Sequence, residues 1–410
     1  MTAHPQAVAD DLTALDLGDP QTFIDADIQE MWRRLRAEDP VHWNVPRGNV
    51  PGFWAITKYA DVVAAYKDNK RLTSERGNVL STLLQGNDSA SGKMLAVTDG
   101  ARHREVRNLM LKSFSPRVLN HVSELVRQRT FRLLRDVIGM GRFDFAADIA
   151  DHIPINTIGD LMDVPEKDRQ QLVQWNNQTL ARHSSEDGEL EEWLARNEIL
   201  MYFSALAEER RSNPGEDVVS TLANGMVGGA PLSEDEIVFN CYSLILGADE
   251  SSRMSSIGAI RALAEHPEQW RALKNGDVTI ESATEEVLRW TTPAMHFGRR
   301  AVADVELNGK RIKDGDVVTM WNSSANFDED VFHDSHEFIL SRTPNKHLSF
   351  GFGPHFCLGA FLGRAHVGAV LEGLRDMVAS IELDGEPTRL YSNFVFGYSS
   401  LPVNLVPEKD

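Results

Sequence analysis

The sequence of 410 residues has few cysteines, a deficit of basic residues and no long apolar run. Its two cysteines, Cys241 and Cys357, are too few for a disulfide framework or a four-thiolate zinc site and fit a reducing, cytoplasmic compartment. Lys and Arg total 42 against 61 Asp and Glu, a net charge of -19, which argues against nucleic acid or an anionic membrane as the main partner. No window approaches about 20 uncharged apolar residues. Residues 1–19 lack the basic and apolar regions of a secretory signal.

The composition is that of a packed globular protein, with 42% hydrophobic and 25% charged residues. No internal repeat or linker is visible, so we predict one domain over residues 1–410, mainly α with a small β portion. Helical periodicity predicts helices at 28–37, within 102–212, at 233–265 and at 358–379. Runs of β-type residues predict strands at 41–45, 52–57, 299–307 and 317–321. Residues 74–92 lack periodicity and are predicted to form a functional or mobile loop, a possible lid.

The longest periodic segment begins with a capping box, in which Ser233 is the N-cap and Glu236 reaches back to it. It continues without proline to about residue 265, a length of about 50 Å at 1.5 Å per residue. Residues 244–248 are apolar on every face, which predicts that they are buried. The polar residues 249–253 follow directly. Burying them unpaired costs several kcal/mol, so we expect them to be used or to pair with one another.

The stretch FGFGPHFCLG at residues 350–359 places Cys357 between a glycine-rich turn and a helix. Gly351 and Gly353 permit a positive φ, and the start of the helix favours a thiolate by lowering the cysteine pKa. Three uses are open: an inert packed cysteine, a nucleophile paired with His355, and an axial ligand to haem iron. An inert cysteine explains neither glycine. Haem ligation needs a backbone that approaches a flat macrocycle and amides around the sulfur, and the stretch supplies both.

This stretch resembles the signature of the cytochrome P-450 superfamily, the haem-thiolate monooxygenases, which reads Phe-Gly-x-Gly-x-His/Arg-x-Cys-x-Gly. Each specified position from Phe350 to Gly359 matches. The resemblance implies a single-domain cytochrome P-450 fold, a triangular helical prism with a long central helix over the haem. It also implies heme b as the cofactor, with Cys357 as the metal ligand and with Phe350, Gly351 and Gly359 around it.

The resemblance extends to other charged positions along the chain. His103 and Arg107 resemble the family's His-x-x-x-Arg, and with Arg299 and His355 they are implied to bind the haem propionates. The sequence alone equally allows a solvated helix face for the first pair.

Glu286 and Arg289 resemble the family's Glu-x-x-Arg, which Arg342 is implied to join in a buried structural network. Residues three apart share a helix face, so this pair also occurs on many solvated helices.

Residues 247–251 are similar to the family segment that crosses the distal haem face with a small residue, an acid and an alcohol. Ala248 departs from the usual Gly and Ser251 from the usual Thr. The resemblance implies that Glu250 relays protons and that Ser251 stabilises reduced dioxygen, with Asp249 as a further catalytic residue beside them. Alternatively, Asp249, Glu250 and an arginine one turn later form an intrahelical ion cluster. Serine lacks the methyl group that restricts χ1, which predicts a looser groove.

The segments implied to line the substrate pocket include 293–297 and 393–396, which contain no Asp, Glu, Lys or Arg. The expected pocket residues are Gly247, Ala294, Met295, Phe297, Phe394 and Val395. Such a lining suits a neutral, partly apolar group. Two family groups are similar: enzymes that β-hydroxylate amino acids tethered to peptidyl carrier proteins in antibiotic biosynthesis, which we favour, and hydroxylases of a free terpene, steroid, fatty-chain or macrolide substrate. A peroxide-driven or non-oxygenating haem protein is the alternative of another class, and Glu250 with Ser251 argues against it.

No flavin or iron–sulfur module is visible, so the resemblance implies electrons from NAD(P)H through a separate ferredoxin and ferredoxin reductase. We expect a monomer that binds a small-molecule substrate and an aminoacyl or peptidyl carrier protein, but neither nucleic acid nor membrane. Basic residues are expected near the cysteine side of the haem, as a docking patch for an acidic ferredoxin or as merely solvated charges. They are Arg104, Lys112, Arg117, Lys346 and Arg364.

Overall fold

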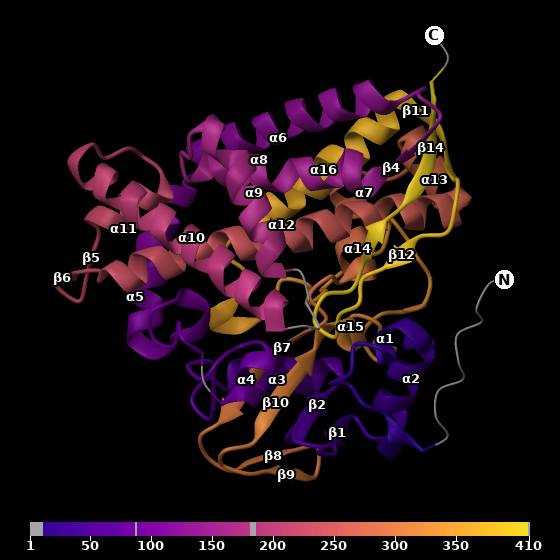
Figure 1. Ribbon diagram of the computed structural model, residues 1–410. Coiled ribbons are helices and arrows are strands. Elements are labelled where there is room, and N and C mark those ends of the chain that lie inside the picture. Colours follow the sequence, from indigo (N-terminus) through magenta and orange to yellow (C-terminus); the bar gives the residue numbers. More distant parts are fainter. Residues whose placement is uncertain (1–10, 87, 181–185, 409–410) are drawn as a thin grey trace.

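The computed structural model describes residues 11–86, 88–180 and 186–408. Residues 1–10, part of the N-terminal segment expected to lack a signal, lie outside the described residues. Helices make up most of the molecule, and the larger sheet lies to one side of them (Figure 1), which confirms a mainly α fold with a small β portion. Of the helices that the structure describes, none combines the length and the apolar character needed to cross a membrane.

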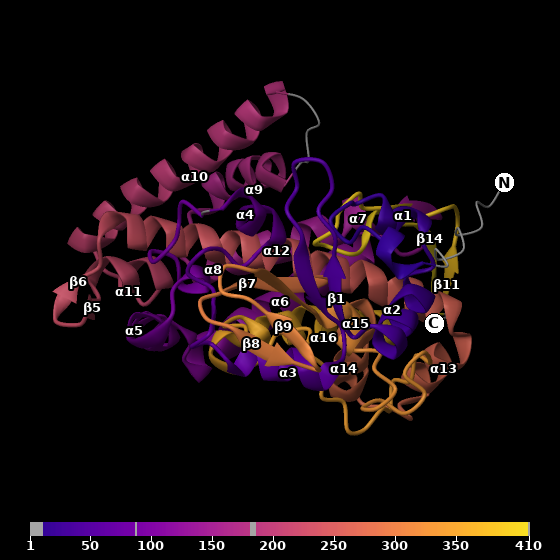
Figure 2. The same ribbon diagram turned by 90° about the horizontal axis from the view of Figure 1, so that it is seen from below.

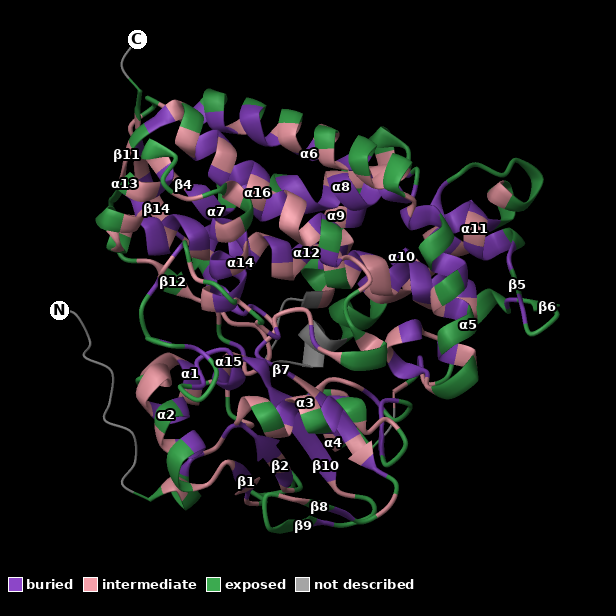
Figure 3. Cartoon of the chain, turned by 180° about the vertical axis from the view of Figure 1, so that it is seen from behind, coloured by how far each residue is buried: buried purple, intermediate pink, exposed green. Residues whose placement is uncertain are grey.

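The helices form a large group and several short connecting elements. The longer ones are α2 (Ile28–Glu38), α3 (Tyr59–Lys67), α5 (Gly100–Met110), α6 (Pro116–Val137), α8 (Ile153–Leu161), α9 (Glu166–Leu180), α10 (Glu186–Ser212), α12 (Glu234–Glu265), α13 (Pro267–Asn275), α14 (Ile280–Thr291) and α16 (Ala360–Met377). The shorter ones are α1 (Thr22–Asp25), α4 (Leu80–Gln85), α7 (Phe145–Asp148), α11 (Val218–Asn224) and α15 (Asn322–Ala325). In outer helices such as α6, buried and exposed residues alternate along the ribbon (Figure 3), as expected for amphipathic helices that pack one face on a core.

The strands form one larger sheet and several small ones. The five-stranded sheet has the order β1-β2-β10-β7-β3, the three-stranded sheet the order β11-β14-β4, and the pairs β12-β13, β5-β6 and β8-β9 complete the set. Their bounds are β1 Val41–Asn44, β2 Phe53–Ile56, β3 Leu72–Thr73, β4 Arg142–Asp144, β5 Met226–Val227, β6 Ala230–Pro231, β7 His296–Ala301, β8 Val305–Leu307, β9 Lys310–Ile312, β10 Val317–Trp321, β11 Val378–Leu383, β12 Thr388–Arg389, β13 Tyr398–Ser400 and β14 Pro402–Pro407. Asn308 and Gly309, both with positive φ, form the turn between β8 and β9.

The helix α12 has the predicted capping box at Ser233 and Glu236 and crosses the helical group over 32 residues, about 48 Å at 1.5 Å per residue. It packs against α8, α10, α14 and α16 (Figure 2). The expectation that residues 244–248 are wholly buried is wrong. Ile245 is buried, but Gly247 is exposed, and a Cβ atom built on it would meet nothing within 4 Å. One face of α12 therefore borders open space within the helical group.

The segment 74–92 was expected to be a loop or lid, and its described residues are more ordered than that. It contains α4, whose Leu80 and Leu83 are buried. The Asn78 carbonyl accepts a hydrogen bond from Gly298 N at 2.7 Å, and the Leu83 carbonyl accepts one from Arg300 Nη2 at 2.7 Å. These contacts attach the segment to β7, the strand that also carries Arg299.

Candidate active site

Cys357 lies between the short helical turn Gly353–His355 and α16, which begins three residues later at Ala360. Gly351 and Gly353 have the predicted positive φ, 69° and 72°. A Cβ on Gly353 would lie 3.1 Å from the Tyr66 carbonyl oxygen, so both the backbone conformation and the close approach require glycine there. The Cys357 amide donates to the Phe350 carbonyl at 2.9 Å, which closes the loop.

Cys357 keeps solvent-accessible surface, although many protein atoms surround its sulfur. Burial raises the pKa of the thiol, while a hydrogen bond from the Gly359 amide and the positive charges of Arg107 and Arg364 oppose the rise. The expected lowering of this pKa by the helix start is therefore wrong, because desolvation outweighs the nearby donors. The Gly359 amide, Arg107 and Arg364 would stabilise the Cys357 thiolate that forms when a metal cation binds the sulfur.

Four side chains around this loop are expected to bind an anion. They are His103 and Arg107 from α5, Arg299 from β7, and His355 from the loop itself. The rings of His103 and His355 are 4.2 Å apart between centroids. Arg107 Nη2 donates to the Phe356 carbonyl at 2.7 Å, so it is turned toward the cysteine loop. Arg299 is buried and donates to the Gly298 carbonyl at 2.7 Å.

Asp99, which sequence reasoning did not single out as a site residue, holds His355 in place. Its Oδ1 lies 2.7 Å from His355 Nε2, and its Oδ2 accepts hydrogen bonds from the Thr73 hydroxyl and the Ser74 amide, both at 2.7 Å. Burial opposes ionisation of Asp99, but these hydrogen bonds outweigh burial and hold its pKa below the usual range. Asp99 is the N-cap residue of α5 and yet makes no capping hydrogen bond, because His355 and β3 use its carboxylate.

Glu286, Arg289 and Arg342 form a buried charge network beneath the cysteine loop. Arg289 donates to Glu286 through Nε and Nη2, each at 2.8 Å, and Arg342 Nε lies 3.1 Å from Glu286 Oε2. The side chains of Glu286 and Arg289 are 0% exposed. Arg289 also donates to the carbonyls of Asn326 and Ser335, which lie in the aperiodic region before Cys357. The network therefore ties α14 to the chain that leads into the cysteine loop.

The acid and the alcohol of α12 have different partners. Ser251 Oγ donates to the Gly247 carbonyl at 2.9 Å, so the hydroxyl bonds the preceding turn beside the open face. Glu250 Oε1 lies 3.3 Å from Arg253 Nη2, and Arg253 Nη1 lies 2.8 Å from Asp151. The ion cluster that the sequence left as an alternative is therefore formed by Glu250 and Arg253, with Asp151 in place of Asp249.

Asp249 is buried and accepts a hydrogen bond from Asn176 Nδ2 of α9 at 2.6 Å. Burial is the main reason that the pKa of Asp249 rises to about 6, and attraction to Arg253 opposes the rise. The residue thus links α12 to α9 and does not share the open face of Gly247 and Ser251.

Five of the expected pocket residues lie in two segments that contact each other. Ala294 pairs with Val395 in a β-bridge, and the rings of Phe297 and Phe394 are 5.9 Å apart. Met295 is an exception among them: it is fully buried in the core and lines a different cleft. Gly247 borders the open face of α12, as described above.

Three features of this site are together typical of a haem-thiolate oxygenase. They are a thiol in a glycine-rich loop, a buried charge network behind it, and an acid–alcohol pair on a central helix with an open face. Residues 194–374 match the family Cytochrome P450. The chain is 47% identical over 405 residues to cytochrome P450 NovI of Streptomyces niveus, covering 99% of this chain and 100% of that protein.

Two further relatives agree. A steroid C26-monooxygenase of Mycolicibacterium smegmatis is 32% identical over 391 residues, covering 92% of this chain and 91% of that protein. The crystal structure of P450 OxyD, involved in the biosynthesis of vancomycin-type antibiotics, is similar with a TM-score of 0.87 and 34% identity, covering 96% of this chain and 100% of that one. The chain belongs to the cytochrome P450 superfamily and is a monooxygenase.

The family implies a haem group, and the donor set of this chain fits one. Among the described residues, Arg299 has no ion-pair partner although it is buried, and the buried His103 Nε2 has no hydrogen-bond partner. A buried guanidinium and an unpartnered ring nitrogen beside His355 are suited to the propionate carboxylates of haem. The accessible sulfur of Cys357 and the open face at Gly247 suit the metal and the macrocycle.

Proposed function

We propose that this monooxygenase β-hydroxylates an amino acid that is tethered as a thioester to a peptidyl carrier protein in antibiotic biosynthesis. The observation that carries the proposal is the uncharged wall formed by Ala294, Phe297, Phe394 and Val395. A free amino acid would bring an ionised carboxylate to this wall, whereas a thioester removes that charge. The similarity to OxyD, a protein of vancomycin-type antibiotic biosynthesis, supports this role over hydroxylation of a free steroid or lipid.

The residues of the chain would divide the work of the reaction as follows. Cys357 would hold the haem iron, and the bound group would supply the chemistry of dioxygen activation. The Ser251 hydroxyl is held by the Gly247 carbonyl at the open face of α12, where its oxygen can accept and pass on a proton. Glu250 would carry protons toward Ser251. The protons would come from the side of Asp151, which is 34% exposed and is connected to Glu250 by Arg253.

Electron delivery is proposed to occur at the cysteine side, from NAD(P)H through a ferredoxin and its reductase. Arg104, Lys112 and Lys346 are exposed and form no ion pair among the described residues, whereas Arg117 and Arg364 are paired with Glu216 and Glu285. The unpaired charges are the better candidates for an acidic partner.

The chain near the cysteine also exposes apolar side chains, which sequence reasoning missed. Leu111 follows α5, Phe356 precedes Cys357, and Phe361 lies in the first turn of α16; all three are exposed. Apolar groups among basic ones are typical of a transient protein interface.

A second exposed apolar surface lies on α10 and is proposed to receive the carrier protein. Leu190, Trp193, Leu194 and Met201 are 56%, 52%, 48% and 58% exposed, and the spacing of the first three places them on one side of the helix. The helix α10 packs on α9, whose Asn176 bonds α12 next to the acid–alcohol pair. A partner on α10 would therefore lie over the helices that cover the site.

A spectral titration tests the substrate class directly. The aminoacyl carrier protein is expected to shift the ferric haem spectrum toward high spin, and the free amino acid is expected to leave it unchanged. The aminoacyl pantetheine without the carrier serves as a control that separates thioester recognition from protein recognition. Shifts with the free amino acid as strong as those with the carrier-bound form would contradict the proposal.

The role of α10 is tested with Trp193→Ala and with Met140→Ala, a matched change at another exposed apolar residue. The first is expected to weaken binding of the aminoacyl carrier by about tenfold or more, as for an interface aromatic, and the second to leave it unchanged. Equal affinities of both variants and of the wild type would remove α10 from the proposed interface.

A second candidate function is hydroxylation of a free steroid or lipid. The uncharged wall suits it equally, and a steroid C26-monooxygenase is among the relatives. Tight spectral shifts with sterols, together with none from the aminoacyl carrier, would favour it.

A further inference from the structure

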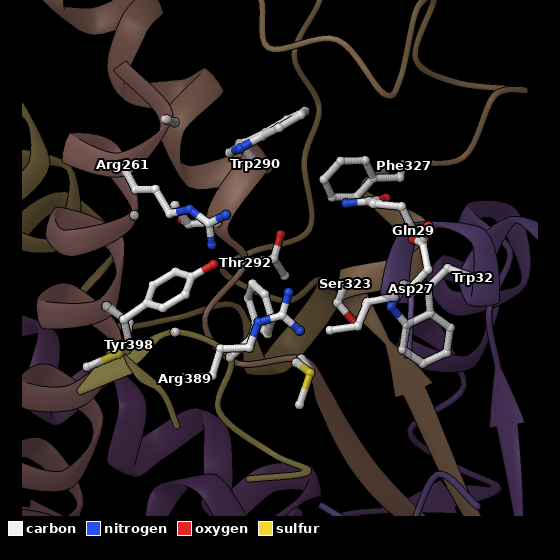
Figure 4. A pocket seen from close by; sticks show the side chains of 18 of the residues that line it. Asp27, Gln29, Trp32, Arg261, Trp290, Thr292, Ser323, Phe327, Arg389 and Tyr398 are labelled. Atoms are coloured by element: carbon white, nitrogen blue, oxygen red, sulfur yellow. The ribbon is translucent and has the colours of Figure 1, made fainter. Parts of the chain in front are cut away.

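A second cleft of about 300 Å³ lies on the far side of the pocket wall, between α2, the C-terminal half of α12 and the end of α14 (Figure 4). Its apolar lining includes Trp32, Met254, Trp290, Phe327 and Phe396. Both the volume and the aromatic lining are in the range of small-molecule binding sites. The cleft is distinct from the site on α12 and the cysteine loop, since it contains none of the residues assigned there except Met295.

The cleft shares a wall with the proposed substrate pocket. The Met295 amide donates to the Phe394 carbonyl at 2.9 Å, and the Phe396 amide donates to the Pro293 carbonyl at 2.8 Å. Ala294 and Val395 are paired between these two hydrogen bonds. Met295 and Phe396 line this cleft, whereas Ala294 and Val395, their neighbours in the chain, do not.

Polar atoms without partners border the cleft. Trp32 is 0% exposed, and its indole Nε1 has no hydrogen-bond partner among the described residues; the same is true of the buried atoms Ser323 Oγ and Gln29 Oε1. Figure 4 shows these three side chains grouped at one end of the cleft. Buried donors rarely stay unpaired; Trp32 is closed off from the cleft, but Ser323 lines it, so a ligand that supplies an acceptor there would satisfy the Ser323 hydroxyl.

Positive charge also borders the cleft. Figure 4 shows Arg261 and Arg389 reaching into it from opposite sides of Tyr398. Arg261 is paired with Glu265 at 2.8 Å, but Arg389 donates only to the Phe23 carbonyl at 3.2 Å and forms no ion pair among the described residues. Burial and, secondarily, repulsion by Arg261 lower the pKa of Arg389, whereas attraction to Asp27, which also lines the cleft, opposes the shift.

We propose that this cleft is a binding site for a small aromatic carboxylate, distinct from the substrate pocket. The carboxylate would accept hydrogen bonds from Arg389 and Ser323, and the ring would lie among Trp290, Phe327 and Phe396. The combination of one unpaired guanidinium, neutral donors and aromatic walls matches an anion with a flat apolar body. Because the wall is shared, an occupant would contact the back of the residues that line the substrate pocket.

The experiment uses the haem-loaded protein and a pair of probes, 1-naphthylacetate and its uncharged analogue 1-naphthylacetamide, in isothermal titration calorimetry. We expect the acid to bind at least about tenfold more tightly than the amide, the effect of one charge-assisted hydrogen bond. Arg389→Gln should reduce this preference to less than about twofold. Arg311→Gln, which changes an exposed arginine paired with Asp304, should leave the preference intact.

Ser323→Ala removes only a neutral donor and provides a second test should Arg389→Gln fail to fold. It should weaken binding of the acid by a few fold and binding of the amide by less, because a neutral carbonyl accepts a weaker hydrogen bond than a carboxylate does. Saturating imidazole, which occupies the haem iron, should not displace the acid. Equal affinities for acid and amide in the wild type, an unchanged preference in both cleft variants, or displacement by imidazole would each overturn the proposal.

Discussion

Replacement of Asp249 by asparagine is expected to stabilise the protein at neutral pH more than in acid. The Asp249 carboxyl is buried in α12 and accepts a hydrogen bond from Asn176 at 2.6 Å. Burial, only partly offset by Arg253, raises its pKa from 3.8 to about 6. Asparagine keeps an acceptor for Asn176 and has nothing to ionise, so it isolates the cost of the charge.

The sign and size of the effect follow from the difference in pKa between the folded and the unfolded chain. A carboxyl with a raised pKa in the folded state binds its proton more tightly there, so stability falls as the pH rises from 3.8 to about 6. A shift of about two units corresponds to about 3 kcal/mol at 1.36 kcal/mol per unit. About half of this loss lies between about pH 5 and about pH 7.5.

Urea unfolding of both proteins at these two pH values, with matched haem content, measures the effect by circular dichroism. The stability advantage of Asp249→Asn over the wild type should grow by about 1.5 kcal/mol from the lower to the higher pH. Asp384→Asn, at an exposed position, controls for the change of charge alone. An advantage that stays constant, or that shrinks toward neutral pH, would refute the assignment of a buried, proton-sensitive carboxyl at position 249.

Three further changes test other parts of the site. Ser251→Ala should uncouple the enzyme, with NAD(P)H consumption retained, product reduced and hydrogen peroxide raised, because the hydroxyl at the open face is lost; unchanged coupling would exclude it from proton transfer. Arg299→Gln should speed haem transfer to apomyoglobin by about tenfold or more, since a charge-assisted hydrogen bond contributes about 1.5–3 kcal/mol; an unchanged rate would contradict its role as a carboxylate donor. Glu286→Gln should lower the free energy of unfolding by about 3–5 kcal/mol, because Arg289 and Arg342 are left without their carboxylate; a loss under about 1 kcal/mol would show that the network is dispensable.

Local patterns in the sequence predict those features that local chemistry determines. The capping box at Ser233 begins α12, the pair Asn308 and Gly309 forms the turn of a hairpin, and the glycines before Cys357 adopt the left-handed backbone that only glycine adopts readily. In each case the residues that interact are neighbours along the chain.

The misjudged features depend on contacts between distant segments. Asp99 holds His355 across 256 residues, and nothing local distinguishes it from an ordinary N-cap. Met295 faces away from the wall that Ala294 forms, and a pattern of apolar residues does not reveal which side each one takes. The sequence around Gly247 suggests a buried helix face, whereas the structure has an open one. The same apolar composition suits contact with protein and contact with a ligand.

The central claim is that Cys357 supplies a thiolate ligand to haem iron. The carbon monoxide complex of the reduced protein tests it most directly, because thiolate ligation shifts the Soret band strongly to the red. The wild type and Cys241→Ser, a change at the other, buried cysteine, should both show this band, and Cys357→His should lose it while haem remains bound. A protein that binds no haem, or a folded wild type whose carbon monoxide complex has an unshifted Soret band, would contradict the account.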